Sequence, residues 1–247
     1  MEAVAKKQLQ VTACKVRLGI IEGVHAAKSG HPGGSLSCAD ILTYLYFKEM
    51  NIDPKDPKKA DRDRLVLSKG HAAPALYSVL ANRGYFDAEL LATLRHPGSI
   101  LQGHPDMKHI PGVDMSTGSL GQGISAAVGM ALSSKHFGDN YNVYAILGDG
   151  EIQEGQVWEA AMFAANKKLS NLTAFIDYNN LQIDGTIEEV NSAAPIDAKF
   201  EAFGWHTITI NGNDFDEIEK AVNEAKTVDK PVAIIAKTVK GLGVSYM

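Results

Sequence analysis

The stretch that most constrains the fold of this chain runs from Tyr141 to Gly185. It contains two apolar segments, Val143 to Leu147 and Leu172 to Ile176, with apolar residues at helical spacing between them. This pattern predicts a strand, a helix and a second strand in succession. In a parallel sheet, both strands end at the same edge, which is where open α/β folds bind ligands.

Polar residues follow both predicted strands. Gly148-Asp149-Gly150 follows the first strand, and Asn179 lies shortly after the second. A carboxylate, an amide oxygen and a backbone carbonyl such as that of Leu181 suit Mg²⁺, which takes its remaining oxygens from phosphate and water. Gly150 allows the backbone to approach a phosphate closely. Each half alone is typical of a capped turn or an ordinary loop. Together, at this spacing, they favour a metal–diphosphate site.

Composition narrows the class of protein. The chain has 247 residues, of which 45% are hydrophobic and 21% charged, and its net charge is −5. No cluster of basic residues suggests nucleic-acid binding, and no apolar run is long enough to span a membrane. We expect one globular domain over residues 1–247. The N-terminus lacks the apolar core of a signal peptide, and the two cysteines, Cys14 and Cys38, are predicted to be buried reduced thiols, so we expect a cytoplasmic protein.

The other patterns predict alternating helices and strands. We expect helices over 3–28, 39–47, 74–83, 124–137, 195–204 and 214–226, and strands over 65–67, 206–210 and 231–236. The segment His31 to Ser35 is predicted to be a turn, with Ser35 or Ser37 capping the helix that follows. The fold class is therefore α/β, a three-layer parallel β-sheet with helices on both faces.

Histidines follow several glycine-rich or strand-terminal segments. His31 lies in the predicted turn, and His71 follows Ser68-Lys69-Gly70 at the end of a short strand. His96, His104 and His109 lie among glycines and prolines, but without a His-x-x-x-His pair or a cysteine partner they do not form a recognisable zinc site. The other histidines alone are typical of loop residues, whereas His71 could equally cap the helix that follows or donate to a phosphate or relay a proton.

Five motifs together resemble those of transketolases. They are Ser29-Gly30-His31-Pro32-Gly33, Leu67 to His71, Gly103-His104-Pro105, Thr117 to Gly123, and Gly148-Asp149-Gly150 followed by Asn179-Asn180. They occur in the family's order, and the resemblance extends from about Leu9 to Tyr246. It implies the thiamine diphosphate-binding fold, specifically the domain that holds the diphosphate (the PP domain).

The resemblance also implies cofactors and residue roles. The cofactors are thiamine diphosphate and Mg²⁺, or Ca²⁺ or Mn²⁺ in its place, with Asp149, Asn179 and Leu181 as metal ligands. The implied cofactor-binding residues are His71, Gly118, Leu120, Gly150, Glu154, Asn179, Leu181 and Ile183. The implied catalytic residues are His31, His71, His104 and Glu154, the last of these in a proton path at a subunit interface. At Lys240, many members of the family have an apolar residue.

Members of this family move a two-carbon ketol unit from a ketose phosphate to an aldose phosphate, as in the pentose phosphate pathway. They activate the cofactor with a glutamate from a pyrimidine-binding domain, which normally follows the PP domain. We expect that domain and the C-terminal domain on a separate chain, with two copies of each chain in a heterotetramer. A further substrate-facing histidine of the family would lie after Met247. The predicted partners are sugar phosphates and this C-terminal transketolase subunit, without nucleic acid or membrane.

Three alternatives remain open. The chain could be half of another thiamine diphosphate enzyme that acts on pyruvate or 2-oxo acids, although three donor-facing histidines favour sugars. It could be a non-catalytic module that binds the cofactor or a partner, although such a module would need only the metal motif. A nicotinamide-dependent dehydrogenase is disfavoured because Thr117 to Gly123 is not a G-x-G-x-x-G fingerprint.

Overall fold

The computed structural model of the chain describes residues 1–183 and 185–247. Its main sheet has five parallel strands in the order β1-β2-β3-β7-β6. Their bounds are β1 Arg64–Leu67, β2 Val143–Gly148, β3 Leu172–Tyr178, β6 His206–Asn211 and β7 Val232–Lys237. Gly148 at the end of β2 pairs with Asp177 of β3. The residues that follow these two strands therefore leave the sheet side by side, as the sequence predicts.

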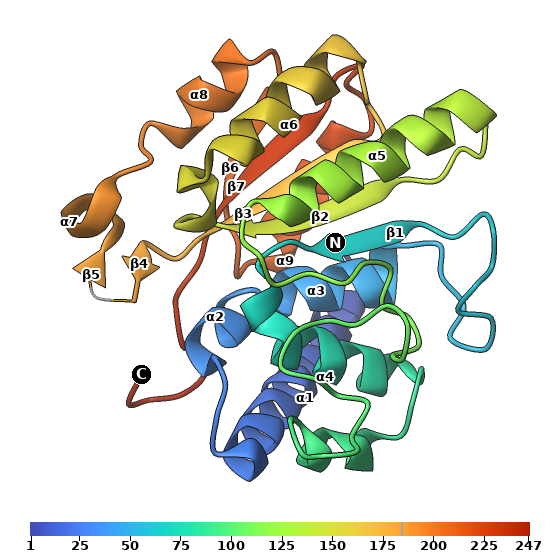
Figure 1. The fold of residues 1–247 in the computed structure, drawn as a ribbon, viewed down its shortest axis with the longest axis vertical. Helices are drawn as coiled ribbons and strands as arrows, with labels where there is room; N and C mark the ends of the chain where they lie inside the picture. The colour runs from blue at the N-terminus through green and yellow to red at the C-terminus, as the bar shows by residue number, and fades with distance from the viewer. Residues whose placement is uncertain (184) are drawn as a thin grey trace.

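Helices cover both faces of the sheet (Figure 1). One face carries α1 Ala3–Ala27, α3 Ala39–Tyr44, α4 Ala73–Arg83 and α9 Phe215–Ala225, and the other carries α5 Gln122–Phe137, α6 Gly155–Asn166 and α8 Ile196–Ala202. Because side chains alternate along a strand, Ile146 and Phe175 pack in the first layer, whereas Leu147 and Ile176 pack in the second. The predicted three-layer α/β architecture is confirmed.

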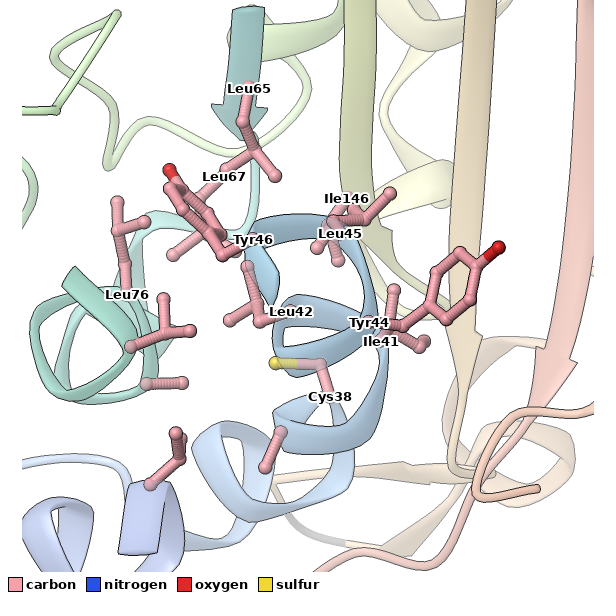
Figure 2. Packing of buried hydrophobic residues seen from close by; sticks show 14 of the residues in the cluster. Cys38, Ile41, Leu42, Tyr44, Leu45, Tyr46, Leu65, Leu67, Leu76 and Ile146 are labelled. Atoms are coloured by element: carbon pink, nitrogen blue, oxygen red, sulfur yellow. The ribbon is translucent and has the colours of Figure 1, made fainter. Parts of the chain in front are cut away.

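The first apolar layer is continuous from the sheet to the helices. Figure 2 shows Leu42 and Leu45 lying between Leu76 of α4 and the strand residue Ile146. Cys38 belongs to the same buried cluster, and burial raises the pKa of its thiol to about 11. Cys14, in contrast, is exposed on α1, so the prediction that both thiols are buried is wrong for this residue.

The predicted turn over His31 to Ser35 is helical. α2 spans Pro32–Ser37, with proline in its first turn, where a missing N–H costs no hydrogen bond. Neither predicted serine cap forms. The Ser35 hydroxyl donates to the carbonyl of His31 at 2.8 Å, and the Ser37 hydroxyl lies 3.1 Å from the carbonyl of Gly34. The glycines suggested a loop, but the proline and these local hydrogen bonds favour a short helix.

A small excursion separates β3 from α8. It consists of the hairpin strands β4 Leu181–Gln182 and β5 Gly185–Thr186, followed by α7 Ile187–Asn191. Thr186 and Glu189 form a capping box at the start of α7. The sequence patterns did not predict this hairpin, which holds Leu181 at the edge of the sheet. None of the helices in the described residues is both long and apolar enough to cross a bilayer.

Candidate active site

A cavity of about 480 Å³ lies where β1, β2 and β3 end. Its walls come from the start of α2, from the segments after these three strands, from the loop before α5 and from the segment after β7. The lining residues with predicted roles are His31, His71, Gly118, Leu120, Asp149, Gly150, Asn179, Leu181 and Ile183. Segments far apart in the sequence thus meet at the carboxyl edge of the sheet, as expected for this fold class.

Asp149 and Asn179 lie next to each other at this edge. The N–H of Gly150 donates to Asp149 Oδ1 at 2.9 Å, and the N–H of Asn180 donates to Asp149 Oδ2 at 2.6 Å. The Leu181 N–H donates to Asn179 Oδ1 at 3.2 Å. Burial raises the pKa of the Asp149 carboxyl to about 6. A cation bound here would replace the water that this carboxylate has lost.

These residues fit a metal that is shared with a diphosphate. The donors are all oxygens, namely one carboxylate, the Asn179 amide and the Leu181 carbonyl, and this carbonyl already accepts a hydrogen bond from the Lys240 ammonium at 3.3 Å. Across the described residues, no group of three or more His, Cys, Asp or Glu side chains could hold a metal by itself. A partial set of hard oxygen donors is what Mg²⁺ requires when phosphate and water complete its coordination.

A glycine forms the cavity wall beside the metal donors. Gly150 lines the cavity, and a Cβ added to it would lie 3.2 Å from Cδ of Gln182. A 3₁₀ turn over Glu151–Gln153 separates this glycine from α6, which begins only at Gly155. The helix predicted between the two strands is therefore present, and the 3₁₀ turn connects it to the glycines.

Two histidines lie side by side in the cavity wall. The ring centroids of His31 and His71 are 5.3 Å apart, in an edge-to-face arrangement. Burial, together with the nearby Lys69 ammonium, lowers the pKa of His71 to about 4. Burial and the Arg95 guanidinium also lower the pKa of His31. Both imidazoles are therefore neutral near neutral pH and can accept or pass on a proton.

His104 is exposed and lies against Gly118 of the cavity wall. A Cβ added to Gly118 would lie 2.9 Å from Cδ2 of His104, and Gly118 has a φ of 152°, which favours glycine. The Tyr77 hydroxyl holds this segment by donating to the His104 carbonyl at 2.8 Å. The structure thus brings His104 beside His31 and His71, although it does not line the cavity itself. His96 and His109 are exposed and lie outside the cavity lining.

Glu154 lies outside the cavity. It is exposed and precedes α6 in extended conformation, with its side chain against Gly121 of the loop before α5. Ile183, in contrast, lines the cavity and is 95% exposed. Both residues present their side chains to the outside, so their predicted roles require a neighbouring molecule or a bound ligand.

Three buried charged residues support the cavity and were not predicted. Lys69, which lines the cavity, forms an ion pair with the fully buried Asp177. Glu151 accepts hydrogen bonds from the N–H of Gly121 at 2.9 Å and from the N–H of Gly148 at 3.0 Å. Its carboxyl group is buried, and burial raises its pKa. The sequence could have indicated these residues, because each is a charged residue inside or shortly after an apolar strand. Charged residues in such positions are rarely buried without a partner.

The segment after β7 enters the site, as the resemblance implies. The N–H of Gly241 donates to the carbonyl of Gly33 at 3.1 Å. A Cβ added to Gly33 would lie 3.0 Å from Cγ of Lys240, so the lysine side chain crosses directly over α2 toward Leu181. Lys240 therefore brings a positive charge to the cavity where many family members have an apolar residue.

Comparison with known proteins agrees with this geometry. Residues 8–246 match the family model described as the thiamine diphosphate binding domain of transketolase. The chain is 51% identical to the 6-deoxy-6-sulfo-D-fructose transketolase subunit SqwG of Clostridium sp. (strain MSTE9), covering 96% of this chain and 87% of that one. It is 45% identical to an apulose-4-phosphate transketolase subunit of Phocaeicola vulgatus, covering 97% of this chain and 85% of that one.

Solved structures confirm the fold. The transketolase of Campylobacter jejuni superposes with a TM-score of 0.91 at 38% identity, covering 96% of this chain and 38% of that one. The transketolase of Leishmania mexicana superposes with a TM-score of 0.93 at 33% identity, covering 96% and 37% of the two chains. The chain therefore belongs to the transketolase family and has the fold of its thiamine diphosphate-binding domain.

Proposed function

We propose that this chain is the diphosphate-binding subunit of a two-chain transketolase, which transfers a two-carbon ketol unit between sugar phosphates. The observation that carries the proposal is the union, in one cavity, of a partial oxygen donor set at Asp149 with the neutral imidazoles of His31 and His71. Relatives whose names describe them as parts of a multi-chain transketolase match this chain over most of their own length. This likeness supports the assignment to one chain of such an enzyme.

The residues at the ends of β2 and β3 hold the cofactor. Asp149, Asn179 and the Leu181 carbonyl would bind a divalent metal, for which we propose Mg²⁺, and the backbone at Gly150 would contact the diphosphate. When bound, thiamine diphosphate supplies an electron-accepting ring that allows a carbon–carbon bond beside a ketone to be broken. Gly118, Leu120 and Ile183 lie where they can contact its remaining parts.

The histidines move protons between the sugar hydroxyls. A neutral imidazole can accept a hydroxyl proton and return it to a neighbouring oxygen. His71 is the more buried of the adjacent pair, and we place it against the cofactor. We place His31 and His104 toward the donor sugar, His104 acting from beside Gly118. Polyhydroxylated donors need several such groups, so this arrangement favours sugars over pyruvate or 2-oxo acids.

The partner would be a chain that carries a pyrimidine-binding domain and the carboxylate that activates the cofactor. Glu154 is exposed beside the cavity, where a docked partner could connect it to a proton path. We propose two copies of each chain, acting in the cytoplasm. The substrates of the two relatives are a sulfonated sugar and a sugar phosphate by name, so we propose a sugar with an anionic terminal group.

The test is to isolate the tagged full chain with its bound partner from its source cells and to assay ketol transfer. We expect transfer from ketose phosphates to aldose phosphates by the complex and negligible transfer by the chain alone. A His31→Ala complex should retain the cofactor but lose most of the transfer. Decarboxylation of pyruvate without ketol transfer would favour the 2-oxo acid alternative, and cofactor binding without any turnover would favour the binding module.

A further inference from the structure

Asp177 is fully buried near the end of β3. It shares a strand face with Phe175, so its side chain points into the layer that contains α2 and the segment after β1. A carboxylate in this position must be compensated by hydrogen bonds or by a cation, because burying an isolated charge is strongly unfavourable. Both kinds of compensation are present.

The carboxylate of Asp177 connects four segments that surround the cavity. It accepts hydrogen bonds from the hydroxyls of Ser37 in α2 and Thr238 after β7, and from the ammonium of Lys69 after β1. Its fourth donor is the side-chain amide of Asn179, with 3.4 Å between Asn179 Nδ2 and Asp177 Oδ2. Every one of these donors lies within a few residues of a residue that we place in the site.

The contact with Asn179 fixes which end of its amide faces the metal position. A carboxylate can only accept hydrogen bonds, so the NH₂ group of Asn179 must face Asp177 and the oxygen must face away. Asn179 Oδ1 is accordingly on the side of Leu181, whose N–H donates to it. This orientation presents an oxygen, and not an NH₂ group, to a cation beside Asp149.

Lys69 holds the Asp177 carboxylate in place. Its ammonium donates to the Gly34 carbonyl at 2.7 Å as well as to Asp177. Burial by itself would lower the pKa of Lys69, but the Asp177 carboxylate raises that pKa above its ordinary value. The two residues therefore form a buried, oppositely charged pair whose partners are all hydrogen-bonded.

We propose that Asp177, held by Lys69, is a positioning residue that orients the Asn179 amide and so sets the affinity of the metal–diphosphate site. This inference rests on the proposed function, because it requires that Asn179 binds the metal. Residues that orient a metal ligand affect metal affinity by about 10- to 100-fold when they are replaced. A purely structural role would instead change stability and leave affinity unchanged.

The test compares Mn²⁺ binding by wild type and by the double variant Asp177→Asn/Lys69→Met. Both charges are removed together because a neutral replacement of a buried ion pair is often tolerated, whereas one unpaired charge is not. Free Mn²⁺ is measured by electron paramagnetic resonance at saturating thiamine diphosphate, on the full chain in the assembly in which it is purified. We expect the double variant to bind Mn²⁺ about 10- to 100-fold more weakly at a similar melting temperature.

A second pair of variants tests the amide orientation directly. Asn179→Asp adds a carboxylate ligand, yet it should weaken Mn²⁺ binding because the new charge faces Asp177. Adding Asp177→Asn to this variant should restore much of the lost affinity. The matched control is Asp114→Asn, which alters another buried, ion-paired carboxylate and should lower stability without changing Mn²⁺ affinity.

The outcomes separate the two proposals. Wild-type affinity in the folded double variant, or stronger binding by Asn179→Asp alone, would overturn the role of Asp177 and leave the proposed function standing. Failure of the wild-type assembly to bind Mn²⁺ and thiamine diphosphate would overturn the proposed function, and the role of Asp177 with it.

Discussion

The two ends of the parallel sheet use buried carboxylates in different ways. At the amino end, Asp63 accepts hydrogen bonds from the N–H groups of Asn51 and Asn142, both at 2.8 Å. Asp114 accepts from the N–H of Leu65 at 2.8 Å and pairs with Arg62. At the carboxyl end, Asp149 also accepts two backbone hydrogen bonds, but it faces a cavity that is lined by histidines.

The difference teaches that burial of a carboxylate does not by itself identify a functional site. Burial raises the pKa of the carboxyl group in Asp63, Asp114 and Asp149 alike. What distinguishes Asp149 is its surroundings, which include adjacent glycines, the oxygens of Asn179 and Leu181 just after a second strand, and a cavity large enough for a ligand. The carboxylates at the amino end only connect neighbouring segments. Asp149 at the carboxyl end also connects segments, but it faces the cavity.

The largest expected effect is a loss of stability on replacing Asp114 at the amino end of the sheet. Replacing Asp114 by alanine leaves Arg62 without its partner and the Leu65 N–H without an acceptor. Removing one partner of a buried pair costs about 3 kcal/mol or more of unfolding free energy. Chemical denaturation should show this loss, and titration with Mn²⁺ and thiamine diphosphate should show unchanged affinity. A clear loss of affinity in a folded variant would break the contrast between the two ends.

The next effect tests the carboxyl end. Asp149→Ala removes the carboxylate from the proposed metal site, and we expect metal and cofactor affinity to fall by roughly 100-fold, which corresponds to about 2.7 kcal/mol. Stability without ligands should change much less than in Asp114→Ala, because the removed carboxylate forms no ion pair with any residue that the structure describes. Isothermal titration and denaturation of the same preparation measure both quantities. Binding at wild-type strength would remove Asp149 from the metal site.

The third effect concerns the pH dependence of stability. The pKa of His71 is about 4 in the folded protein and has an ordinary value of 6.5. Between pH 6.5 and pH 4, His71 is therefore protonated in the unfolded chain but not in the folded chain. Stability falls as the pH decreases through this range, because protonation favours the unfolded chain. Between about pH 7 and pH 5, His71 should account for a loss of roughly 2 kcal/mol.

The matching measurement is urea denaturation of wild type and His71→Gln at both pH values. Glutamine does not titrate, so the variant should lose less stability on acidification than wild type does. Other histidines, including His206 beside Glu224, contribute equally to both proteins and cancel in the comparison. Equal pH dependence of the two proteins would mean that His71 is accessible to protons in the folded state.

The smallest effect tests the packing of His104 against the cavity wall. Gly118→Ala introduces a Cβ only 2.9 Å from Cδ2 of His104 and places a side chain at a φ of 152°. We expect about 1 kcal/mol of destabilisation and a displaced His104, with a corresponding loss of ketol transfer in the assembled enzyme. Gly129→Ala is the control, because a Cβ there meets nothing within 4 Å. Full activity of Gly118→Ala would exclude a role for His104 at its observed position.

Most of the fold could be predicted because four of the five strands in the main sheet contain continuous apolar runs, whereas β6 alternates polar and apolar residues. The apolar runs predicted β2 and β3. Because parallel strands end at the same edge of a sheet, they also predicted that Asp149 lies close to the segment around Asn179. The helix α2 was missed because its glycines outweighed the proline that starts it. The hairpin of β4 and β5 was missed because strands of two residues carry no periodicity.

The site was less predictable than the fold because part of it depends on contacts between distant segments. The resemblance of the motifs to transketolases indicated His31, His71 and His104, and the structure places them together. The pairing of Lys69 with Asp177 spans 108 positions and leaves no local pattern. The same is true of Glu151, whose carboxylate joins the loop before α5 to the end of β2.

The most direct test of the central claim is native mass spectrometry of the untagged protein, purified gently from its source cells with Mg²⁺ present. A cofactor-binding subunit should appear in an assembly of two copies of this chain with two copies of a second polypeptide, together with two thiamine diphosphates. Detection of this chain alone, without a second polypeptide and without thiamine diphosphate, would contradict the claim.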